Sequence, residues 1–141
     1  MKTWCSLKRL WLTRLLIIIV IVWNLQTALA FLLAPAIYAP AFELSGVPGQ
    51  AAVRGIAVLF VMWNIPYLHA AWHPRRNLLS LKESVLMQAI GVLGETGILL
   101  SIKTGYPALR ASILRFIAFD AIGLVLLLFA LWLVVRGKPS A

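Results

Sequence analysis

Two acidic residues lie deep inside long apolar runs of this sequence. Glu95 lies within the run Val85–Leu100, and Asp120 lies within the run Ile113–Val135. The chain has only four acidic residues, so half of them stand where a charge is hardest to solvate. A charge at bilayer depth costs at least ~2.5 kcal/mol, so such residues usually face a protein interior and often mark a functional site. The chemistry open to this pair is proton exchange or the binding of a polar ligand.

The composition indicates a membrane protein. The 141 residues are 62% hydrophobic and 12% charged, whereas a soluble domain is about 45–50% apolar and about 25% charged. A net charge of +9 could suggest nucleic acid, but the basic residues stand at the ends of apolar runs and form no stripe with interleaved aromatics. We therefore expect the lipid bilayer, and no nucleic acid, as a partner.

Four stretches are long enough to cross ~30 Å of hydrocarbon as helices. Each must be helical, because a spanning segment has to satisfy its own backbone hydrogen bonds. We predict a single all-α domain over residues 1–141, a polytopic antiparallel bundle of four transmembrane helices. The expected spans are about 10–33, 54–72, 81–102 and 108–135, with an interfacial outer loop over 34–53.

The outer loop is rich in proline and glycine, which excludes one long helix. It also carries apolar side chains, so it is no solvated tether. We expect it to lie at the outer interface, with a short helix around Pro40–Leu44 and with Tyr38 and Phe42 as anchors.

The distribution of Lys and Arg predicts the orientation. Nine basic residues fall on one side: Lys2, Lys8, Arg9, Arg14, Arg75, Arg76, Lys82, Arg136 and Lys138. Both termini should then be cytoplasmic, in a bacterial inner membrane. Arg75 and Arg76 would contact anionic lipid head groups. A competing interpretation treats Met1–Ala30 as a cleaved signal peptide, because Ala28-Leu29-Ala30 fits a cleavage site.

Polar side chains from all four spans fall near one depth, about 12–15 Å below the outer ends at 1.5 Å per residue. They are Asn24, Asn64, Glu95 and Asp120. The short turn at Gly105 makes the last two spans antiparallel, so Arg115 is level with Glu95, and Asp120 lies about a turn and a half deeper. We predict that Glu95 pairs with Arg115 and that Asp120 is hydrogen-bonded below them.

Two interpretations of this layer remain open. In the first, Glu95, Arg115 and Asp120 are a structural lock for the bundle. In the second, they form a proton or ligand site, since low dielectric and mutual repulsion favour one proton shared by the two carboxyl groups. Asn64 and Tyr67 would then form a wall of that site.

A second polar pair is expected in the inner half of the bundle. His69 and Gln88 lie within about one turn of the same depth, and a hydrogen bond would satisfy both. A metal site is not expected, because His73 is the only other histidine and no cysteine stands close. The sequence has no phosphate-binding glycine loop, no CxxC and no HExxH, so no catalytic set is visible, which disfavours an enzyme.

Several features together give a family resemblance. They are the size, the four spans, the proline-bearing segment after the first span, the pair Arg54-Gly55 and the run Gly91…Gly94-Glu95. With these features the chain resembles the DoxX-like group of small four-helix bacterial membrane proteins. The resemblance implies a four-helix fold. A few members of that group are associated with quinone-linked sulfur oxidation or redox homeostasis, and the resemblance supplies no catalytic residues for this chain.

Three functions follow as expectations. The first is an accessory or assembly subunit of a membrane complex, acting with a membrane-protein partner or as a homo-oligomer. The second is a DoxX-like redox-associated protein that binds a quinone or lipid within the bundle; no other cofactor is expected. The third is a small proton-coupled transporter that uses the buried pair Glu95 and Asp120.

Overall fold

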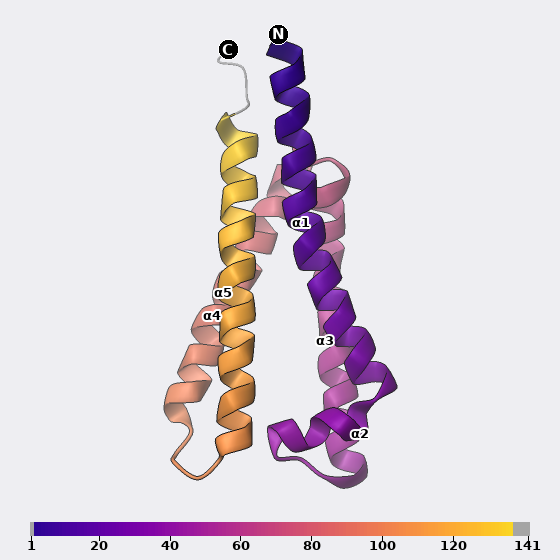
Figure 1. The fold of residues 1–141 in the computed structure, drawn as a ribbon, viewed down its shortest axis with the longest axis vertical. Coiled ribbons are helices and arrows are strands. Elements are labelled where there is room, and N and C mark those ends of the chain that lie inside the picture. Colours follow the sequence, from indigo (N-terminus) through magenta and orange to yellow (C-terminus); the bar gives the residue numbers. More distant parts are fainter. Residues whose placement is uncertain (1, 137–141) are drawn as a thin grey trace.

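The computed structural model describes the backbone of residues 2–136 and the side chains of residues 7–136. All of its described elements are helices (Figure 1). Their order is α1 (Lys2–Leu33), α2 (Pro35–Tyr38), the 3₁₀ helix η1 (Ala39–Phe42), α3 (Gly46–Trp72), α4 (Leu78–Ser101) and α5 (Pro107–Arg136). The side chains of Lys2 and Lys138, which enter the orientation prediction, lie outside the described residues.

Four helices are long and apolar enough to cross a membrane, which confirms the all-α, four-span prediction at this level. The described stretches are Leu7–Leu33, Gly46–Trp72, Leu78–Ser101 and Pro107–Arg136. The shortest has 24 residues and is about 36 Å long at 1.5 Å per residue, more than the ~30 Å hydrocarbon layer. The chain therefore has the make-up of a multi-pass membrane protein.

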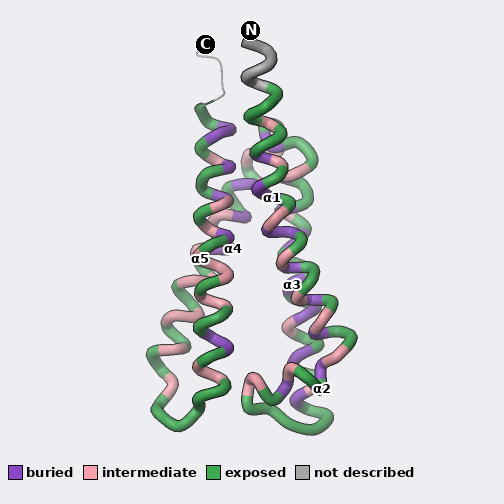
Figure 2. Tube along the Cα trace, viewed as in Figure 1, coloured by how far each residue is buried: buried purple, intermediate pink, exposed green. Residues whose placement is uncertain are grey.

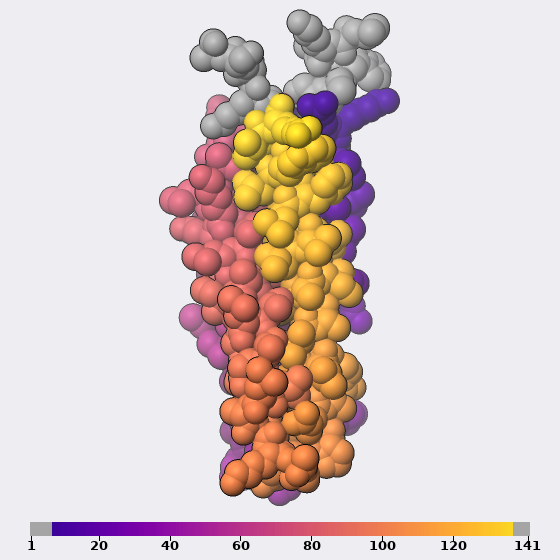
Figure 3. Space-filling model, turned by 90° about the vertical axis from the view of Figure 1, so that its left-hand side faces the viewer, coloured from indigo at the N-terminus to yellow at the C-terminus, as the bar shows by residue number. Residues whose placement is uncertain are grey.

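The four long helices form a ring. α1 packs against α3 and α5, and α4 packs against the same two helices. The start of α1 and the end of α5 lie at one end of the molecule, whereas the α4–α5 turn and the α2–η1 segment lie at the other (Figure 1). Figure 3 shows α4 and α5 side by side along one face. Facing side chains of α4 and α5 can therefore interact along much of their length.

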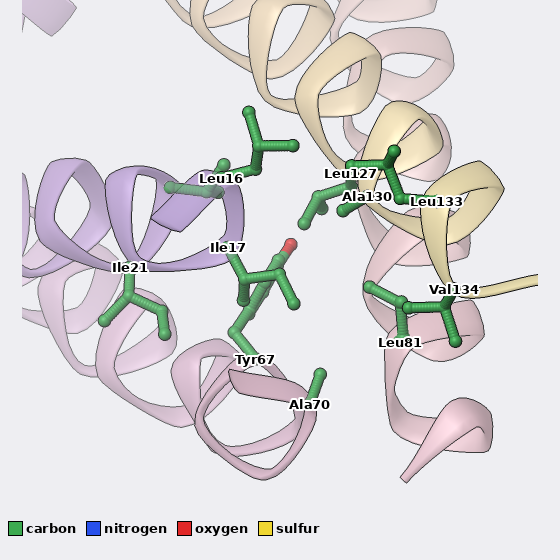
Figure 4. Close-up of a cluster of buried hydrophobic side chains, with 11 residues drawn as sticks. Leu16, Ile17, Ile21, Tyr67, Ala70, Leu81, Leu127, Ala130, Leu133 and Val134 are labelled. Atoms are coloured by element: carbon green, nitrogen blue, oxygen red, sulfur yellow. The ribbon is translucent and has the colours of Figure 1, made fainter. Parts of the chain in front are cut away.

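Two clusters of buried apolar side chains hold the ring together. The first joins all four long helices, with the Tyr67 ring among aliphatic side chains such as Ile17, Leu81 and Leu127 (Figure 4). The second joins α1, η1 and α3 through Ala28, Phe31, Ala39, Val53, Ala57 and Phe60. α4 takes no part in the second cluster, and its buried residues all lie in its first half (Figure 2).

The segment after α1 folds back as two short helices. Pro35 and Pro40 stand in the first turns of α2 and η1, where a missing N–H breaks no helical hydrogen bond. Tyr38 and Phe42 pack against Phe31 of α1, with ring centroids 4.9 and 5.9 Å apart. Aromatic packing thus ties this segment, which we call the strap (residues 34–45), to the bundle.

The helix α3 begins at Gly46, upstream of the span boundary that the sequence predicted near residue 54. Pro48 allows this because it stands in the first turn, whose N–H groups have no intrahelical acceptor. The helix then continues without a break through Pro66 to Trp72.

The first prediction concerns the attachment of α4 to the core. Leu81 of α4 is 0% exposed within the first cluster, whereas Leu86 of the same helix is 60% exposed. We expect Leu81→Ala to lower the free energy of unfolding by about 2 kcal/mol. This is the low end of the range for a buried leucine, because lipid tails are as apolar as the protein interior and the variant loses mainly packing contacts. Thermal unfolding in detergent measures this, with Leu86→Ala as the control that changes little. Equal effects of the two variants would contradict the packing of α4.

Candidate functional site

A chain of hydrogen bonds crosses the bundle from α3 through α4 to α5. The Tyr67 hydroxyl donates to Gln88 Oε1 at 2.7 Å, and Gln88 Nε2 donates to Asp120 Oδ1 at 3.0 Å. Tyr67 is 2% exposed and Gln88 is 3% exposed, so neither could find water instead. The amide of Gln88 is satisfied at both ends. We call this set Tyr67–Gln88–Asp120 the polar chain.

Two glycines make room for the polar chain where α4 meets α5. A Cβ atom on Gly91 of α4 would collide with Asp120 Oδ2, and a Cβ atom on Gly123 of α5 would collide with Gln88 Nε2. Gln88 and Gly91 are three residues apart on one helix, as are Asp120 and Gly123 on the other. Each helix therefore presents a polar side chain to the glycine of its neighbour, which allows close approach.

Glu95 lies about two turns beyond Gln88 on the same face of α4. Its side chain is half-buried. Glu95 Oε2 is buried and has no hydrogen-bond partner among the described residues. That oxygen is open to one further donor.

The structure does not bring Glu95 and Arg115 together, in contrast to the sequence prediction. Arg115 Nη2 donates to Ser112 Oγ at 3.0 Å, and no ion pair joins Arg115 to Glu95 in the described part of the chain. The predicted register of α4 against α5 was nearly correct, since Gln88 and Gly91 face Asp120. Arg115, however, lies about 140° around α5 from Asp120 at 100° per residue. It therefore turns away from α4.

The predicted pair of His69 and Gln88 is also replaced. Gln88 bonds Tyr67 and Asp120, whereas the side chain of His69 is exposed. The two α3 residues are two positions apart, or about 200° around the helix, so only one of them can face Gln88. Tyr67 takes that place.

The two asparagines of the predicted polar layer are buried, and among the described residues neither forms a hydrogen bond with the polar chain. Asn64 Nδ2 donates to the Phe60 carbonyl oxygen of its own helix at 2.7 Å, and Asn64 Oδ1 has no partner among the described residues. Asn24 of α1 is 3% exposed. The four residues of the predicted layer therefore do not form one site, although we expected them at about the same depth.

A cavity of about 460 Å³ lies between α1, the strap and α5. Five of its lining side chains are aromatic. The lining consists of Thr27, Phe31, Ile37, Tyr38, Ala41, Phe42, Ser112, Arg115, Phe116 and Phe119. The rings of Phe42 and Phe116 stack across the strap–α5 contact at 5.9 Å. This volume and this lining fall within the range of small-molecule sites, ~300–1,000 Å³.

Arg115 is the cation of this lining, and a serine holds it in place. Ser112 Oγ donates to the Ala41 carbonyl oxygen at 2.6 Å and accepts from Arg115 Nη2 at 3.0 Å. The other N–H groups of Arg115 have no acceptor among the described residues. A guanidinium with free donors beside aromatic rings can bind an anionic or carbonyl oxygen.

Sequence reasoning found Arg115 but missed the cavity. A sequence signal did exist, because α5 carries four lining residues at helical spacing: Ser112, Arg115, Phe116 and Phe119. The strap supplies the other wall, and its fold depends on contacts with Phe31 that lie outside any local pattern.

Comparisons with known proteins identify no relative. No protein family, curated protein or solved structure matches this chain. Within residues 2–136, no group of three or more His, Cys, Asp or Glu side chains could hold a metal ion. The assignment of function therefore rests on the geometry of the polar chain and the cavity.

The second prediction tests the glycines of α4. Gly91→Ala should destabilise the protein by about 1–3 kcal/mol, because the new Cβ displaces Asp120 and breaks its bond to Gln88. Gly94→Ala meets no atom within 4 Å and should stabilise the helix by up to about 1 kcal/mol. Thermal unfolding of both variants gives the signs. A stabilising Gly91→Ala would show that Asp120 does not lie over Gly91.

Proposed function

We propose that this chain is a bacterial inner-membrane protein that binds a quinone- or lipid-like amphiphile in the cavity beside Arg115. The observation that carries the proposal is the cavity of about 460 Å³, with five aromatic side chains and one guanidinium in its wall. Ligand sites combine an apolar lining with a few polar groups that fix orientation, as here. Binding needs no catalytic residues, and none are assigned.

The proposed topology is an antiparallel four-span bundle with both ends of the chain in the cytoplasm. It is supported by the shared end of α1 and α5 in Figure 1 and by the basic residues near that end, including Arg9 and Arg136. Arg75 and Arg76, between α3 and α4, would meet anionic head groups of the inner leaflet. The cavity then belongs to the outer leaflet.

The resemblance to the DoxX-like group agrees with this proposal. That resemblance associates a few members with quinones, and an aromatic-walled cavity suits a quinone ring as well as a lipid chain. No functional residue is carried over from the group.

The third prediction tests occupancy of the cavity. Ala41→Trp places an indole in the cavity, whereas Ala36→Trp adds the same bulk at an exposed position of neighbouring α2 that does not line it. Native mass spectrometry of protein extracted from bacterial membrane should show a bound small molecule on the Ala36→Trp variant and its loss from Ala41→Trp. Equal retention by both variants would contradict ligand binding in this cavity.

A second candidate function is an accessory subunit that binds a partner helix on α4. The second half of α4 has no buried residue, and Gly94 and Gly97 face open space. A neighbouring helix could approach closely at these two glycines.

The fourth prediction belongs to this second candidate. If α4 carries the interface, then Gly94→Leu combined with Gly97→Leu should remove a stoichiometric partner chain or second copy from the purified complex. Ala118→Leu adds a side chain of the same kind at an exposed position of α5 and should leave the complex intact. Native mass spectrometry reports the stoichiometry. A lone chain in wild type excludes the subunit, and an unchanged complex in the glycine variant excludes this face.

A further inference from the structure

We infer that the ligand of the cavity carries an anionic head group, a carboxylate or a phosphate, which Arg115 binds. This inference rests on the proposed function and adds the charge of the ligand and the residue that recognises it. The cavity is amphiphilic, since Arg115 and the aromatic rings share its lining.

Arg115 carries a positive charge within a helix long and apolar enough to span a membrane. The chain has four acidic residues, all within the described range, and none of them forms an ion pair with Arg115. Glu43 of the strap accepts instead from the Leu109 backbone N–H at 3.4 Å. An arginine within a membrane-spanning helix is costly without a partner, so it normally faces an anion, a carbonyl group or water. Here an anion from outside the chain would neutralise it.

Two hydrogen bonds position the guanidinium of Arg115 beside the strap. Ser112 holds one arm of the guanidinium, and Ser112 is itself fixed by the carbonyl oxygen of Ala41. The free N–H groups of Arg115 keep the planar fork that matches two oxygens of a carboxylate or phosphate. Arg115 is exposed, so these donors are accessible, and the hydrogen bond to Ser112 limits their motion before a head group binds.

Aromatic side chains line the cavity around Arg115. Phe116 and Phe119 follow Arg115 along the same face of α5, and Phe31 of α1 and Phe42 of the strap complete the apolar wall. A free inorganic anion would not fill the part of the cavity that these rings line. An anion joined to an acyl or ring body would fill both parts of the cavity, so the chemistry favours an anionic amphiphile.

Two sources could supply this chemistry, a phospholipid of the membrane or a free fatty acid. We would measure binding to the purified full chain in nanodiscs of phosphatidylcholine, using as probes oleate, phosphatidylglycerol and the neutral oleyl alcohol. The variants are Arg115→Gln, Arg115→Lys and Ala41→Trp, each checked for folding by its thermal unfolding temperature. Arg115→Gln removes the charge while its amide can still bond Ser112, and Arg115→Lys keeps the charge.

The fifth prediction is a selective loss. Arg115→Gln should weaken binding of the anionic probe by at least about tenfold and change oleyl alcohol binding less than about twofold, because only the charge-assisted bonds are lost. Arg115→Lys should recover part of the affinity. The anionic probe that binds wild type more tightly identifies the source, with oleate for a free acid and phosphatidylglycerol for a phospholipid.

The two proposals fail in different ways. If Arg115→Gln binds the anionic probes as wild type does, while Ala41→Trp abolishes binding of any probe, the cavity is a ligand site but the anionic inference is overturned. If the wild type binds oleyl alcohol more tightly than either anionic probe, the anionic inference is overturned as well. If Ala41→Trp changes the binding of no probe, the proposed function fails together with the inference.

Discussion

The hydrogen bond between Gln88 and Asp120 fixes how α4 and α5 face each other. Its length is 3.0 Å, and each of the two side chains lies against the glycine of the opposite helix. A turn of either helix would leave a buried amide or carboxyl group without a partner, and lipid offers no replacement. Tyr67 extends the constraint to α3, so three of the four long helices depend on one polar chain. The polar groups thus set the rotation of these helices about their axes, and the apolar clusters fill the remaining space between them.

The rotation of α5 also determines which side chains its opposite face presents to α1 and the strap. With Asp120 turned toward α4, the face about 140° away carries Arg115 toward α1 and the strap. The polar chain and the cavity therefore share one helix but not one surface. The first has its hydrogen bonds largely satisfied inside the protein, which suits a structural lock. The second presents free donors beside aromatic rings, which suits a ligand.

Much of the fold could be predicted from the sequence, because span length and loop length follow from simple geometry. For that reason the predicted depth of Asp120 relative to α4 was close to the observed one. The facing of side chains could not be predicted equally well, since each residue turns a helix by 100° and an error of one position changes the neighbour. Arg115 was assigned to Glu95 and His69 to Gln88 by depth alone. The strap, which packs on Phe31 and forms one wall of the cavity, had no local signal for its position.

Cysteine cross-linking tests the rotation of α5 most directly. In a background with Cys5→Ser, one variant combines Gln88→Cys with Gly123→Cys, and another combines Glu95→Cys with Arg115→Cys. The structure places the side chain of residue 88 against Gly123 across α4 and α5, so mild oxidation in the membrane should join the two introduced thiols. The second pair should stay reduced, although it lies at one depth. A disulfide between positions 95 and 115, with none between 88 and 123, would contradict the account.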